Sequence, residues 1–300
     1  MVHEIQKERG FTAGYLASGK QKFVVELKQQ REITNTKLDD LQKNIQSLDN
    51  EILEYLNNLD IINNLAKIQS LRSSIDDNKI SAIDAISQYT KIIKNQIQLN
   101  RINMDKSAEF EDLYKLTKSL YNFTQIKENY GQLRANINRI ATADSVDYNG
   151  YQNVTRLYHN NNLLKDEFDK YATEDLTLHI KELSNKEIYN KVNTIIEKVL
   201  THYGKKGLSI TPTVWFNDAT TYINELSTIE ESMFINILKI AGSLQDSNYS
   251  KFITYTILIV VILIIIIWFN VYITLSTSNK IKVATNLIRE ISQGNLKITI

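Results

Sequence analysis

Arginine side chains are the groups in this sequence with the clearest chemical use. Arg9 lies one helical turn from Ile5, so on a helix it borders the apolar face and can point inward, with the Thr12 hydroxyl nearby as a further donor. A guanidinium offers two parallel donors in a planar fork, which suits a small planar oxyanion better than an ammonium does. Alternatively, any one arginine is a solvated or salt-bridged residue, and Glu8 and Glu128 are close enough to serve as its partner.

Other site chemistries find little support in the sequence. There is no cysteine, no glycine-rich phosphate loop, no G-x-S-x-G elbow and no kinase signature. The histidines are scattered and form no H-x-x-x-H or H-E-x-x-H pair, which disfavours a zinc site. We therefore expect no enzyme activity, no catalytic residue, no bound metal and no cofactor. The four histidines are His3, His159, His179 and His202.

Composition points to an all-α protein with no electrostatic preference for nucleic acid. The 35 basic and 34 acidic side chains nearly cancel, so we expect no nucleic-acid partner. Nine glycines and one proline in 300 residues leave few helix breakers. The absence of cysteine excludes a disulfide framework and is compatible with a location outside the cytoplasm.

Apolar periodicity predicts a series of long helices. Gly19 is expected to end the first helix, Ser81 with Asp84 to cap the fourth, and Thr211 with Pro212 to start the last one. Eight helices of this length suit two stacked up-down four-helix bundles. The remaining helices are expected at about 20–57, 60–73, 107–141, 150–174 and 176–203, and the last one at 212–275.

An unbroken apolar run from Ile257 to Phe269 predicts a membrane span. With its flanks the segment covers 252–275, and at about 1.5 Å per residue it can cross a hydrocarbon core of roughly 30 Å. A buried core helix is the alternative, which an uncharged run so rich in isoleucine disfavours. The last helix is thus expected to continue into a transmembrane helix.

Three stretches of the sequence carry a family likeness. They are QKERGFTAGYLASG at 6–19, KENYGQLRA at 127–135, and the pairs WF at 215–216 and AT at 219–220. In this order and at these separations they resemble the NIT domain, the nitrate- and nitrite-sensing module of bacterial receptors and antiterminators. The likeness extends over about 1–245, so we expect a sensor domain at 1–247.

The resemblance implies two four-helix bundles with the anion between helices, coordinated by arginines. On the matching positions, Arg9 and Arg134 are the expected ligands, and Arg31 and Arg72 match less distinctive stretches. Nitrate is small, planar and weakly hydrated, as such a guanidinium site requires. The commoner motif has a carboxylate where Leu133 stands, which puts in doubt any charge network carried over to Arg134.

The residues after the apolar run resemble the start of a HAMP module, a coiled-coil relay of membrane receptors. Apolar residues recur at spacings of three and four, and a Gly-Asn-Leu sequence follows at 294–296. We expect a partial HAMP module at 276–300, with an ordinary amphipathic juxtamembrane helix as the alternative. The recurring apolar residues are Ile281, Ala284, Ile288 and Ile291.

Together these features predict the sensor region of a bacterial receptor, a chemoreceptor or a sensor kinase. It would bind nitrate, nitrite or a similar small anion outside the inner membrane, cross the bilayer once, and signal to an output domain beyond this chain. Lys280 and Lys282 after the span favour a cytoplasmic C-terminus. The resemblance also implies a homodimer. Two alternatives remain: a tail-anchored tethering or fusion bundle, and the same receptor with a different ligand, such as an amino acid or organic acid.

Overall fold

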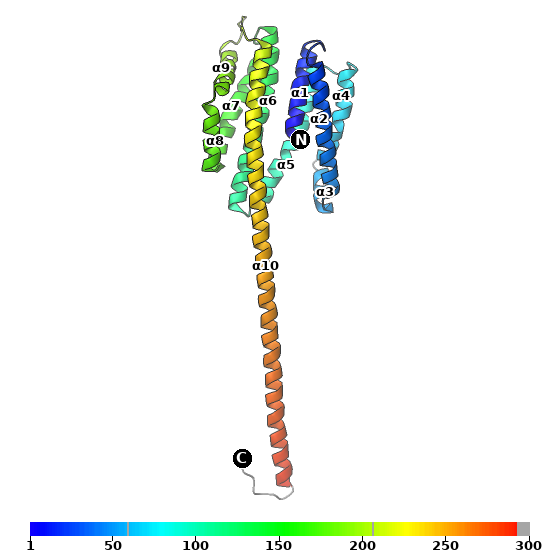
Figure 1. The fold of residues 1–300 in the computed structure, drawn as a ribbon, viewed down its shortest axis with the longest axis vertical. Helices are drawn as coiled ribbons and strands as arrows, with labels where there is room; N and C mark the ends of the chain where they lie inside the picture. The colour runs from blue at the N-terminus through cyan, green and yellow to red at the C-terminus, as the bar shows by residue number, and fades with distance from the viewer. Residues whose placement is uncertain (59, 206, 293–300) are drawn as a thin grey trace. The chain divides into compact units, whose positions relative to one another are not determined.

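The computed structural model describes residues 1–58, 60–205 and 207–292, and within them the regular elements are α-helices with no strand. This confirms the predicted all-α class. Scarce glycine and proline leave long stretches in which every backbone group can bond within a helix. The helices, shown in Figure 1, are α1 (Val2–Ala17), α2 (Val24–Gln46), α3 (Asn50–Asn58), α4 (Ile61–Asp76), α5 (Ala82–Lys106), α6 (Glu111–Ala143), α7 (Tyr148–Tyr171), α8 (Glu174–Ser184), α9 (Glu187–Thr201) and α10 (Pro212–Ser292).

The first bundle is formed by α1, α2, α4 and α5, with the short α3 against α4. The predicted cap of α5 is present, because the Ser81 hydroxyl accepts the Asp84 N–H at 3.1 Å. Apolar side chains from α1, α4 and α5 face each other and form a buried core. Its central members are Ile5, Ile68, Leu71, Ile75, Tyr89 and Ile93.

The second bundle is formed by α6, α7, the α8–α9 pair and the beginning of α10. Phe123 of α6 packs on Phe168 of α7, with ring centroids 5.6 Å apart. The indole of Trp215 in α10 donates to the backbone carbonyl of Arg134 in α6 at 2.9 Å, in the interior. Both α1 and α5 contact α6, so the two bundles lie side by side along α6 (Figure 1).

Two predicted helices are each divided in the structure. The expected helix at 20–57 is split into α2 and α3, because the Ser47 hydroxyl bonds to the Asn44 carbonyl at 2.7 Å and competes with the helical backbone. The expected helix at 176–203 is split into α8 and α9 at Asn185, a poor helix former. Gly19, with φ of +62°, follows the end of α1 as predicted.

Helix α10 begins at Pro212 as predicted and is the described helix that is long and apolar enough to cross a membrane. This fits a membrane protein. By its internal contacts the chain divides into a unit at Met1–Leu238 and a second that begins at Lys239. The predicted HAMP region is helical as far as Ser292. Its expected Gly-Asn-Leu connector at 294–296 lies outside the described residues, so the HAMP assignment stays a prediction.

Candidate anion site between the bundles

Arg134 of α6 lies where α1, α6 and α10 meet. Its guanidinium donates from Nη1 to the Thr220 hydroxyl of α10 at 2.8 Å, and from Nη2 to the Gln6 backbone carbonyl of α1 at 3.2 Å. The Phe216 ring of α10 covers one face, with its centroid 4.9 Å from Cζ. Only 3% of Arg134 is exposed. Three helices therefore hold one cation inside the protein.

This buried cation has no carboxylate of its own. Among the described residues no acidic side chain forms an ion pair with Arg134, and its Nε has no hydrogen-bond partner. Burial, and then the charge of Arg9, lower the pKa of Arg134 to about 9, and the charge of Glu128 opposes both. A desolvated charge without a counter-ion is costly. The position therefore favours an added anion.

Arg9 of α1 is equally buried but is paired. Its Nη1 lies 2.5 Å from Oε1 of Glu128 and its Nη2 3.1 Å from Oε2, and Nη1 also donates to the Thr90 hydroxyl at 2.9 Å. Glu128 also accepts from the amides of Gln6 and Gln132, each at 2.9 Å. The carboxylate of α6 is thus the present counter-ion of the α1 arginine.

Two glycines let these arginines cross between the helices. A Cβ on Gly10 of α1 would lie 2.2 Å from Nη2 of Arg134, and a Cβ on Gly131 of α6 would lie 2.7 Å from Nη2 of Arg9. Each guanidinium therefore occupies the space over the other helix's glycine. This reciprocal contact gives a physical reason for the ERG stretch and for the spacing of glycine and arginine in YGQLR.

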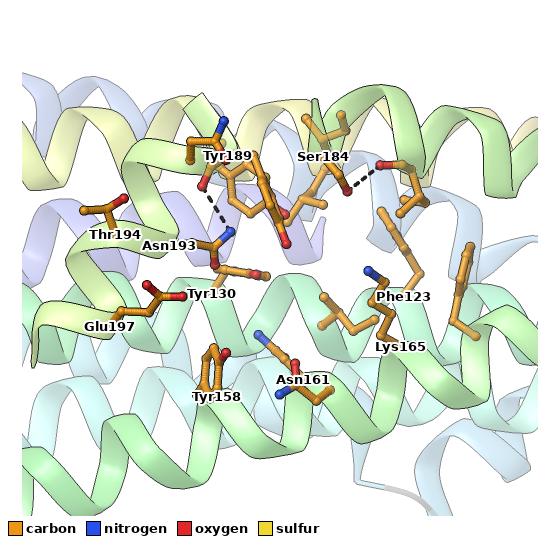
Figure 2. A pocket seen from close by; sticks show the side chains of 18 residues that line it. Phe123, Tyr130, Tyr158, Asn161, Lys165, Ser184, Tyr189, Asn193, Thr194 and Glu197 are labelled. Atoms are coloured by element: carbon orange, nitrogen blue, oxygen red, sulfur yellow. Dashed lines mark hydrogen bonds between the residues drawn. The ribbon is translucent and has the colours of Figure 1, made fainter. Parts of the chain in front are cut away.

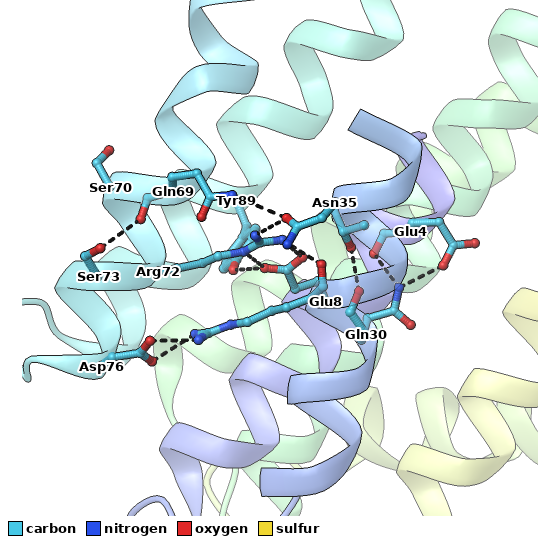
Figure 3. Close-up of polar contacts among 12 residues, drawn as sticks. Glu4, Glu8, Gln30, Asn35, Gln69, Ser70, Arg72, Ser73, Asp76 and Tyr89 are labelled. Atoms are coloured by element: carbon cyan, nitrogen blue, oxygen red, sulfur yellow. Dashed lines mark hydrogen bonds and ion pairs between the residues drawn. The ribbon is translucent and has the colours of Figure 1, made fainter. Parts of the chain in front are cut away.

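The structure places Arg72 in a separate polar cluster inside the first bundle. Its Nε and Nη2 each donate to the Glu8 carboxylate at 2.7 Å, and its Nη1 donates to Asn35 at 2.6 Å (Figure 3). The Tyr89 hydroxyl donates to the same carboxylate at 2.7 Å. Burial, and then the charge of Glu8, raise the pKa of Tyr89. Arg72 is therefore a charge-matched member of the bundle interior.

The other two predicted site residues also belong to the first bundle. Arg31 forms a two-point ion pair with Asp76 near the surface, with N–O distances of 2.8 and 3.0 Å. Thr12 is fully buried, beside the hydroxyl of Tyr89. Among the predicted residues, then, the structure brings together Arg9 and Arg134 and places Arg31, Arg72 and Thr12 elsewhere.

Several residues of the site were not singled out from the sequence. Lys127 is fully buried and pairs with Glu230 of α10. With Arg9, Arg134 and Glu128 this makes three cations and two carboxylates, a net charge of +1. Thr220 and Phe216 were visible only as parts of the family-like third stretch. A single compensating charge is what one monovalent anion supplies.

A cavity of about 260 Å³ reaches the buried Arg9 from the surface. It lies among α5, α6 and α7, and Thr90 and Gln132, both bonded to the Arg9–Glu128 pair, belong to its lining. Arg156 of α7 lines its exposed part. A small anion can thus approach Arg9 through this cavity, past the guanidinium of Arg156.

A helical domain with buried arginines where two bundles meet fits the class of small-molecule sensor domains. Residues 1–238 match the family model for nitrate and nitrite sensing, NIT, and the chain belongs to this family. The resemblance to the NIT domain is thereby confirmed, and the family is a sensing family rather than a catalytic one.

A solved structure supports the fold. The chain is similar to the structure of the NasR transcription antiterminator, with a TM-score of 0.70 and 21% sequence identity over 81% of this chain. The match covers 66% of the NasR chain, which is less than two thirds of its length. At this identity the likeness establishes the fold alone. A comparison with curated proteins found no match.

Proposed function

We propose that this chain is the sensor region of a bacterial membrane receptor and that it binds nitrate or nitrite between Arg9 and Arg134. The observation that carries the proposal is the burial of Arg134 without a carboxylate, in a cluster with one net positive charge. The family supports the ligand class, because its description is nitrate and nitrite sensing.

The geometry suits a planar monovalent oxyanion. One nitrate oxygen accepts from the open Nε of Arg134, and another competes with Glu128 for the fork of Arg9. Each charge-assisted hydrogen bond contributes about 1.5–3 kcal/mol. Two arginines with a few neutral donors then reach about −8 kcal/mol, which corresponds to micromolar affinity.

Signalling follows from the bond between Arg134 and α10. An anion that draws the α1 and α6 arginines together also moves Thr220, which accepts from Arg134 and belongs to α10. Because α10 is one helix from the site through the predicted membrane segment, the shift passes along it to a HAMP module and an output domain. The ligand must favour one state by about 1–3 kcal/mol to act in this way.

We further propose that the receptor is a homodimer in the inner membrane, with the sensor domain outside and the C-terminus in the cytoplasm. The candidate span in α10 supports the bilayer as a partner, and Lys280 and Lys282 support the orientation. The tethering-protein alternative lacks a role for a buried, uncompensated arginine.

The test is calorimetric titration of the full chain in lipid nanodiscs with nitrate, nitrite and chloride. We expect saturable binding of nitrate over chloride, weakened by more than about tenfold in Arg9→Ala and in Arg134→Ala. The matched control is Arg139→Ala, because Arg139 lies on the same helix α6 but is paired with Asp147 at the surface. No saturable heat from the folded protein, or undiminished binding by Arg134→Ala, would refute the assignment.

A further inference from the structure

The second bundle contains a cavity of about 320 Å³ that is separate from the arginine site. Side chains of α6, α7, α8, α9 and the early part of α10 line it, and its volume is at the lower end of the range for small-molecule sites. Figure 2 shows tyrosine, amide and charged groups directed into it from opposite helices. Such a set of convergent polar groups indicates a ligand site.

Four tyrosines form the first recognition element. Tyr130 and Tyr222 meet edge to face with ring centroids 4.8 Å apart, the Tyr189 ring lies 6.0 Å from Tyr222, and Tyr158 lines the same cavity. Burial raises the pKa of Tyr130 to about 12 and also raises that of Tyr222, so both phenols stay neutral. The faces of neutral aromatic rings attract ammonium groups.

Two side chains of opposite charge form the second element. Glu197 of α9 and Lys165 of α7 both line the cavity, and neither forms an ion pair within the described part of the chain. In Figure 2 they lie toward opposite ends of the cavity, with Tyr158 and Asn161 between them. Tyr158 and Lys165 are separated by roughly 10 Å along the helix axis, at about 1.5 Å per residue.

The middle of the cavity offers amides rather than charges. Asn161 is buried, and its Oδ1 accepts from Asn129 at 2.8 Å, which turns its Nδ2 donors toward other partners. Asn193 has the opposite arrangement, since its Nδ2 donates to the Tyr189 carbonyl at 3.1 Å and its Oδ1 remains an acceptor. Phe123 and Phe168 supply apolar wall beside Lys165.

We propose that this cavity binds a small organic zwitterion whose ammonium and carboxylate are joined by a short alkyl chain. The ammonium lies among the tyrosine rings next to Glu197, and the carboxylate pairs with Lys165. An ω-amino acid has this arrangement of charges, whereas an α-amino acid holds them too close together to reach both ends. The site does not depend on the anion site between Arg9 and Arg134.

The first test is calorimetric titration of the full chain in nanodiscs with 5-aminovalerate, pentylamine and valerate. We expect saturable one-to-one binding of 5-aminovalerate. Pentylamine and valerate, which each carry one of its two charges, are expected to bind more weakly by about tenfold or more. Binding of either compound as tight as that of 5-aminovalerate would overturn the zwitterion assignment. Absence of saturable 5-aminovalerate binding to the folded chain would overturn the site itself.

Variants then locate the binding. Glu197→Gln and Lys165→Met are each expected to weaken 5-aminovalerate binding by about tenfold. The matched controls are Glu187→Gln on α9 and Lys170→Met on α7, because both residues are exposed and lie outside the cavity. Unchanged affinity in both cavity variants, with the helical circular-dichroism signal intact, would contradict the proposal.

Discussion

Arg9 and Arg134 are both buried where the bundles meet, yet their surroundings differ in charge. Arg9 has Glu128 as a two-point partner, whereas Arg134 has, within the described part of the chain, neutral acceptors and an aromatic face. Because an unpaired guanidinium in the interior gains most from a counter-ion, we propose Arg134 as the primary anion ligand and Arg9 as the shared one. Gly10 and Gly131 then provide the space that the guanidinium groups of Arg134 and Arg9 occupy between the helices.

Gly10→Ala tests this fit at the residue scale. The added methyl would lie 2.2 Å from Nη2 of Arg134, so the guanidinium must move and nitrate affinity is expected to fall by about tenfold or more. Calorimetric titration measures the loss. Gly242→Ala is the matched control, since open space surrounds Gly242 and the change improves helix propensity by about 1 kcal/mol. Wild-type affinity in Gly10→Ala would argue against the crossing geometry.

His3 predicts a pH dependence of stability at the same scale. Burial, and then the charges of Lys127 and Lys7, lower its pKa to about 3 from the ordinary histidine value of 6.5. At pH values between these two pKa values, the unfolded chain binds a proton at His3 that the folded chain does not. The free energy of unfolding therefore decreases as pH falls through this window, by at most about 1.4 kcal/mol per pH unit.

Denaturant unfolding at pH 7.5 and pH 5 measures this effect. We expect a decrease of at most about 2 kcal/mol in the unfolding free energy for the native chain, and a smaller one in His3→Gln. Equal pH dependence in the two proteins would show that other groups cause it.

At the scale of elements, three helices meet at Arg134. Helix α6 supplies the arginine, α1 supplies the Gln6 carbonyl, and α10 supplies Thr220 and Phe216. Of these, α10 alone continues into the apolar segment. The hydroxyl of Thr220 is therefore the point at which the proposed anion site and the proposed signalling helix are joined.

Thr220→Val tests that junction. The variant keeps the side-chain shape and removes the acceptor for Nη1 of Arg134, so nitrate affinity is expected to change by several-fold, at about 1 kcal/mol per hydrogen bond. Titration of the nanodisc-embedded chain reads out the change. Thr228→Val on the exposed face of the same helix is the control. An equal change in nitrate affinity for both variants would contradict a role of Thr220 in the proposed anion site.

At the scale of the whole molecule, the chain consists of a helical sensor unit and a second unit whose apolar side chains are exposed in the absence of lipid. Exposed apolar surface of this extent marks an interaction surface for lipid or protein. The length and apolarity of the helix fit a membrane protein.

The double variant Ile262→Arg with Ile265→Asp tests the span. Two charges near the centre of the apolar run cost about 2.5–3.5 kcal/mol each on insertion, enough to offset much of its apolar gain. Glycosylation mapping and alkaline extraction are expected to show loss of integration. Placing the same two charges at Ser243 and Gln245, before the apolar run, is expected to leave integration intact. Full integration of the central variant would contradict a transmembrane role for this segment.

Sequence alone determined the helical class, the apolar span, the start of α10 at Pro212 and the family. These depend on local periodicity, caps and composition, which a linear pattern records. Only the tertiary structure decided that Arg72 and Arg31 are paired with Glu8 and Asp76, and that Arg134 forms no ion pair with a carboxylate among the described residues. Counter-ion assignment depends on residues 45 and 64 positions apart in these two pairs, and no periodicity encodes such contacts. The predicted helices break at Ser47 and Asn185, where polar side chains compete with the helix for backbone groups. The sequence does not distinguish these two residues from the many polar residues that lie within helices.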